Sequence, residues 1–187
     1  MGLALAGSIS FSSCAADYLD TVPSGSVSDV TINSTLETLY LALNGIHKEM
    51  VSQESGVQCL GGEPGFMMCR DAAADDITWQ TNTWMQAAYL GWQANMNDQT
   101  AYNNRYWQIY YQWILNANKI LLGLESVSNT NQALFNQIQG EALCIRAWAH
   151  FNLVQLYGKR YDVTLAENVQ DGIPYREAPE ATPQARN

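Results

Sequence analysis

The sequence is poor in charge, and basic residues are especially scarce. Only 14% of its 187 residues are charged, and 9 Lys and Arg stand against 18 Asp and Glu, which gives a formal net charge of −9. A chain with this balance repels phosphate backbones, which argues against nucleic acid as a partner. The sequence also lacks an apolar run of 18 or more residues, so we predict no membrane-spanning helix.

Catalytic and cofactor-binding signatures are missing as well. There is no P-loop, no G-x-G-x-x-G, no G-x-S-x-G and no paired-histidine zinc motif, and the two histidines, His47 and His150, stand alone. Asp75 and Asp76 are adjacent, whereas glycoside hydrolysis needs two carboxylates that flank the scissile bond. We therefore predict no enzymatic activity, no cofactor and no metal centre. Asp75-Asp76 is interpreted as a turn or helix cap, with a weak calcium site as the alternative.

Neutral polar residues and aromatic rings take the place of charge. Asn, Gln, Ser and Thr are frequent, and the chain contains six Trp and ten Tyr. Flat rings beside uncharged polar side chains are typical of surfaces that bind neutral, hydroxyl-rich ligands, although helix packing also uses aromatic residues. The 47% of hydrophobic residues suffices for a packed core.

The N-terminus has the pattern of a bacterial lipoprotein. Residues 1–13 carry no charge and contain a short apolar stretch of signal-peptide length, which ends in small residues directly before Cys14. We therefore predict a signal peptide over 1–13, a lipid on Cys14, a polar tether over 14–30 and a folded domain over 31–187.

Three further cysteines need separate interpretations. Cys59 and Cys69 flank a glycine-rich stretch and could close a small disulfide loop in an exported protein. Cys144 lies among apolar residues within a predicted helix, and we expect it to be a buried thiol.

Periodic apolar residues predict three helices. The first begins with the capping box Ser34-Thr35-Leu36-Glu37 and continues to Met50, and the others cover 103–124 and 131–157. The third is apolar around most of its circumference, so we expect it to be packed on most sides. The segment 52–102 lacks a sustained period, and we interpret most of it as loop, with short helices as the alternative for part of it.

The last two helices are joined by a short connection, which predicts an antiparallel hairpin. Glu141 and Arg146 are expected to find partners within it, because unpaired buried charge is costly. No strand is strongly indicated. The predicted fold is mainly α, with long antiparallel helices in a TPR-like arrangement and large irregular loops.

Motifs in both hairpin helices resemble those of a known family. The third helix contains G-E-A-x-x-x-R-A-x-x-x-F-x-L-x-x-x-Y-G from Gly140 to Gly158, and the second contains the set Trp107, Tyr111, Ile114, Ala117 and Asn118. Asp17-Tyr18-Leu19-Asp20 after Cys14 and Gly172-Ile173-Pro174 after the third helix also fit. The chain is similar in these motifs to the SusD/RagB family of outer-membrane nutrient-binding lipoproteins.

The resemblance implies a SusD-like fold and a surface protein that captures an oligo- or polysaccharide. It would deliver this glycan to a SusC-like TonB-dependent transporter, anchored in the bacterial outer membrane by its lipid. Family members are much longer, so the chain is expected to represent the N-terminal part of such a protein. The alternative is a TPR-like helical module that binds a protein or peptide, and a glycan-degrading enzyme is a third reading without support from paired carboxylates.

Sugar binding needs an exposed aromatic platform with amide groups at its rim. Trp79, Trp84, Trp92 and Asn95 lie in the aperiodic segment from which the family draws part of its ligand contacts, and we predict that they bind the glycan. The alternative is that these tryptophans pack against the helix pair. Arg70 is expected to form a surface salt bridge, with donation to sugar hydroxyls as the alternative.

Overall fold

The computed structural model describes residues 35–52, 61–74, 101–164 and 172–179. These ranges contain four helices and no strand: α2 (Leu36–Val51), α3 (Gly62–Ala73), α5 (Ala101–Ser126) and α6 (Gln132–Tyr157). The mainly α prediction is therefore confirmed. None of the helices in the described ranges is long and apolar enough to cross a membrane.

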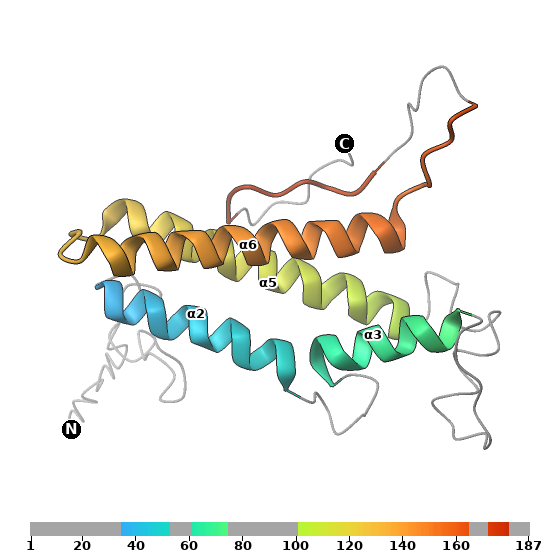
Figure 1. Ribbon diagram of the computed structural model, residues 1–187, viewed down its shortest axis with the longest axis horizontal. Coiled ribbons are helices and arrows are strands. Elements are labelled where there is room, and N and C mark those ends of the chain that lie inside the picture. Colours follow the sequence, from blue (N-terminus) through green and yellow to red (C-terminus); the bar gives the residue numbers. More distant parts are fainter. Residues whose placement is uncertain (1–34, 53–60, 75–100, 165–171, 180–187) are drawn as a thin grey trace, which may run out of the picture.

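The two longest helices form the predicted antiparallel hairpin (Figure 1). α5 and α6 have 26 residues each. Asn131 caps α6, because its side chain accepts a hydrogen bond from the backbone N–H of Leu134 at 3.2 Å. Gly158 follows the last helical residue, as the sequence indicated.

The short helix α2 packs across this hairpin and contacts both of its helices. Its cap is Thr35 rather than the predicted Ser34, which lies outside the described residues. The Thr35 hydroxyl accepts from the N–H of Thr38, and the Thr38 hydroxyl accepts from the N–H of Thr35. The Thr38 hydroxyl thus makes the return hydrogen bond that the capping box predicted for the Glu37 carboxylate. The helix begins one residue later than predicted.

The helix α3 is a short helix within the segment 52–102, where short helices are the alternative to the loop that we predict for most of the segment. Gly62 makes the sharp entry into this helix with φ at 65°, a left-handed conformation that favours glycine. A side-chain carbon at this position would collide with the backbone of Met50 at the end of α2. The glycine therefore allows α2 and α3 to follow one another closely.

The core lies where α2 and α3 meet the hairpin. Trp113 is fully buried in it, 5.3 Å from Tyr110 and 6.3 Å from Trp148 between ring centroids. Its Nε1 is buried without a hydrogen-bond partner in the described part of the chain. A buried donor of this kind costs about 1–3 kcal/mol, which the burial of the surrounding rings offsets.

The outward side of α6 corrects two predictions. Leu143, Phe151 and Val154 are 40%, 57% and 43% exposed, so the helix is not packed on most sides by the described elements. Cys144 is exposed rather than buried. The contacts of α6 with α5 and α2 bury only part of its circumference. Its apolar residues extend beyond that part, so some of them are exposed.

Candidate functional site

The residues that the sequence singled out for ligand binding lie outside the described residues. This holds for Trp79, Trp84, Trp92 and Asn95, and also for Cys14, Cys59 and the pair Asp75-Asp76. Their assignments stay predictions. Cys69 is buried in the core, and its pairing with Cys59 also stays a prediction.

Residues 172–179 form an extended segment, which we call the strap. It runs along the hairpin on the side opposite α2 and α3 (Figure 1). The strap follows α5 in the same direction, because Tyr111 contacts Pro174 and Asn118 contacts Ala178. The hairpin is thus covered by helices on one side and by this strap on the other.

Side chains of both hairpin helices hold the strap by its backbone. The Tyr111 hydroxyl donates to the carbonyl of Pro174 at 2.7 Å. The Asn118 amide donates to the carbonyls of Arg176 and Ala178 at 3.2 and 3.3 Å. These bonds do not depend on the side chains of the strap, which explains how an irregular segment is positioned accurately.

Arg146 ties the two anchoring helices together at the same place. Its Nη1 donates to the Asn118 side-chain oxygen at 3.1 Å and to the carbonyl of Glu177 at 3.2 Å. The prediction that Arg146 finds a partner is confirmed. Glu141 is only partly buried; its carboxylate accepts from Gln137 at 2.9 Å and lies 3.9 Å from His47.

His150 completes the anchoring group, and the geometry defines its protonation. The backbone N–H of Arg176 donates to His150 Nε2 at 3.0 Å, so this nitrogen carries no proton. The proton is therefore on Nδ1, which donates to the carbonyl of Arg146 at 2.8 Å. Burial is the main cause that lowers the pKa of His150, and it favours the neutral ring that this arrangement requires.

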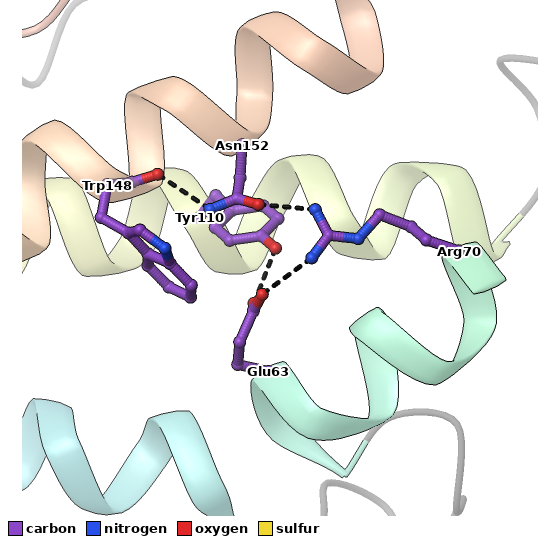
Figure 2. A network of polar contacts seen from close by, with 5 residues as sticks. All are labelled: Glu63, Arg70, Tyr110, Trp148 and Asn152. Carbon is purple, nitrogen blue, oxygen red and sulfur yellow. Dashed lines mark hydrogen bonds and ion pairs between the residues drawn. The ribbon is translucent and has the colours of Figure 1, made fainter.

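A second polar network fixes α3 against the hairpin (Figure 2). Arg70 Nη2 lies 3.0 Å from one carboxylate oxygen of Glu63, and the Tyr110 hydroxyl donates to the other at 2.7 Å. Arg70 Nη1 also donates to the side chain of Asn152, whose amide donates to the carbonyl of Trp148 at 2.9 Å. The salt bridge predicted for Arg70 exists, but it is part-buried rather than on the surface.

Burial dominates the electrostatics of this network. It raises the pKa of Glu63, while the Tyr110 hydroxyl and the Arg70 guanidinium act in the opposite direction. Burial and the neighbouring carboxylate both raise the pKa of Tyr110, which stays protonated and donates. Because each polar group has a partner, the network is suited to holding α3 in place rather than to proton transfer.

A groove of about 340 Å³ lies between the C-terminal half of α5, the N-terminal half of α6 and the end of the strap. We call it the hairpin groove. Its described lining residues are the apolar Leu121, Leu122, Leu124, Phe135, Leu143, Ala178 and Pro179 and the polar Asn118, Glu125, Gln139, Arg146 and Glu177. Phe135 is the one aromatic ring among these described residues, so they differ from the aromatic platform predicted for a glycan.

The sequence did not predict the strap, and it did not identify Tyr111, Asn118 or His150 as its anchors. Tyr111, Asn118 and Arg146 belong to the family motifs, and this shared membership was the signal in the sequence that could have pointed to a common role. The sequence also gave no reason to single out Tyr161 and Tyr175, which are 69% and 50% exposed. No group of three potential metal ligands occurs within the described ranges.

Comparison with known proteins adds one finding. Residues 17–186 match the model of a SusD-like family described as starch-binding and associating with the outer membrane. Comparisons with individual curated proteins and with solved structures give no match. The match covers both motif-bearing helices and the strap, and the chain therefore belongs to the SusD-like family of starch-binding proteins that associate with the outer membrane.

Proposed function

We propose that the chain is a surface lipoprotein that captures an oligo- or polysaccharide and delivers it to a SusC-like TonB-dependent transporter. The observation that carries this proposal is the match to the SusD-like family over residues 17–186. The low charge and the abundance of neutral polar and aromatic residues agree with a neutral glycan as ligand. In this role the protein binds its ligand without chemical conversion.

The use of tryptophan in the described part of the chain supports a platform elsewhere. Trp113 is fully buried, Trp148 stacks on it, and Trp107 packs between Tyr111 and Tyr157 with ring centroids at 4.7 and 5.0 Å. These three rings serve the helix packing. The remaining tryptophans, Trp79, Trp84 and Trp92, together with Asn95, are therefore our candidates for the glycan contacts.

The proposed platform is tested by replacing its rings singly and together. Each of Trp79→Ala, Trp84→Ala and Trp92→Ala should weaken binding to soluble amylose, or to the polysaccharide found in a glycan panel, by about twofold to tenfold. Tyr161→Ala removes an exposed ring that is not among the proposed contacts and serves as the matched control. Calorimetric titration gives the affinities.

Two outcomes separate errors in the function from errors in the residues. If the wild-type protein binds no neutral polysaccharide, the proposed function is wrong. If it binds one and the triple variant retains the full affinity, the platform is misplaced. Release of new reducing ends from the bound glycan would contradict the view that the protein is not an enzyme.

The membrane and transporter steps need separate experiments. We propose that Cys14 carries the lipid, so Cys14→Ala should shift the protein from the membrane fraction to the soluble fraction of its host. Mass spectrometry of the mature N-terminus checks the modification. Co-purification of a TonB-dependent transporter with the wild-type protein tests delivery, and a protein isolated without such a partner would contradict it.

A further inference from the structure

We propose that the hairpin groove binds a polypeptide segment that presents a leucine-sized side chain next to a lysine or arginine. This inference concerns an interaction surface and does not rest on the glycan function. The groove lies between α5, α6 and the strap.

The leucines of the groove favour an aliphatic occupant. They include Leu121, Leu122 and Leu143, and the last two are 50% and 40% exposed although they line a concave site. Removing this apolar surface from water stabilises a complex, and the volume of about 340 Å³ lies at the lower end of the range for ligand sites. One side chain the size of leucine, with part of its backbone, suits such a space.

The charged residues of the groove favour a positive charge on the occupant. Glu125 and Glu177 both line the groove, are exposed, and form no salt bridge with a described residue. Among the described lining residues Arg146 is the one cation, and its Nη1 is already bonded to Asn118 and to the carbonyl of Glu177. Two carboxylates against one guanidinium give these described residues a net negative charge, and the net charge of −9 of the chain adds long-range attraction for a cation.

The same features disfavour the other ligand classes. A sugar would place hydroxyl groups against leucine side chains, where they would lack hydrogen-bond partners. A fatty acid would bring its carboxylate to a groove that is lined by Glu125 and Glu177. A peptide fits better, because the exposed amide of Gln139 can pair with its backbone.

The experiment uses short peptides as probes on the full chain. N-acetyl-Leu-Lys-amide is titrated while the methyl resonances of Leu122 and Leu143 are followed by NMR, in parallel with N-acetyl-Leu-Glu-amide and N-acetyl-Gly-Lys-amide. We expect saturable shifts of these methyl groups with the first peptide and an affinity roughly threefold to thirtyfold higher than with the second. The glycine peptide should bind more weakly than the first.

Matched variants locate the site. Glu125→Gln should weaken binding of the lysine peptide by up to about fivefold, and Leu122→Ser should weaken it further, since both side chains are exposed and the fold does not depend on them. Glu37→Gln and Leu41→Ser make the same changes on exposed positions of α2 and should leave binding unchanged. Equal affinity for the lysine and glutamate peptides, shifts confined to other methyl groups, or stronger perturbation of the groove by maltotriose or hexanoate would each overturn the proposal.

Discussion

Protonation of His150 should loosen the strap. The neutral ring accepts a hydrogen bond from the Arg176 N–H at 3.0 Å and donates one to the Arg146 carbonyl at 2.8 Å. An imidazolium ring has a proton on both nitrogens, so Nε2 can no longer accept, and the Arg176 N–H then faces another donor. Among the described residues, the charges that act on the ring are Arg146, which disfavours protonation, and Glu177, which favours it.

The sign of the pH dependence follows from the lowered pKa of His150. The unfolded chain, with a histidine pKa near 6.5, binds this proton before the folded chain does. The stability contributed by the neutral ring is therefore complete above about pH 6.5 and is lost as the pH falls through the lower folded pKa. The slope of the unfolding free energy is at most about 1.4 kcal/mol per pH unit for this one proton.

The direct readout is the exchange of the Arg176 amide hydrogen, measured by NMR as a protection factor between pH 7.5 and 5. Losing the acceptor for a partly buried donor costs about 1–3 kcal/mol, so the protection factor should fall roughly 5- to 150-fold. His150→Gln supplies an acceptor that does not titrate in this range and should flatten the profile. His47→Gln removes the exposed histidine on α2 and should leave the fall intact. Constant protection of the Arg176 amide while the ring of His150 titrates would refute the reasoning.

Three further predictions concern stability, measured as the free energy of unfolding in urea. Gly62→Ala should cost more than about 2 kcal/mol because of the φ of 65° and the collision with α2. Gly140→Ala should instead stabilise by about 0.5–1 kcal/mol, because Gly140 lies in a helix with open space around it. Equal effects of the two substitutions would contradict this. Leu153→Ala should cost about 2–5 kcal/mol and its exposed neighbour Val154→Ala under about 1 kcal/mol; a reversed order would show that the burial is misassigned. Arg70→Met should cost roughly 2–4 kcal/mol, since it leaves a buried carboxylate without its cation; a neutral effect would show that the ion pair does not hold α3.

The long helices were predictable because their signals are local and repeated. Asn131 and Gly158 mark the ends of α6, and the apolar spacing between them defines its buried face. The exposure of Cys144 and Phe151 was not predictable in the same way. The spacing of apolar residues predicts which side chains share a helix face. It does not show whether another element covers that face.

The helix α3 could not be located from the sequence because Gly62, Pro64 and Gly65 resemble a turn. Burial of Phe66 and the bonds of Glu63 to Tyr110 and Arg70 stabilise the helix from outside its own segment. Such long-range contacts have no signature in a local window.

The strap and the side chains that anchor it were likewise only partly predictable from the sequence. The motif residues Tyr111, Asn118 and Arg146 could be identified from the sequence, but the backbone carbonyls that they bind lie 31 to 63 residues further along the chain. A carbonyl carries no sequence information. The sequence therefore identifies these polar motif residues but not the backbone carbonyls to which they donate.

The anchoring of the strap also has a consequence for the order of folding. Its binding surface combines Asn118 of α5 with Arg146 and His150 of α6, and Arg146 bonds to Asn118 and to the strap at once. This surface exists only after the two helices have paired, whereas their pairing needs only a short connection to close. The hairpin should therefore form early in refolding and the strap should dock late, and the same hierarchy makes the strap the first of these described elements to open under native conditions.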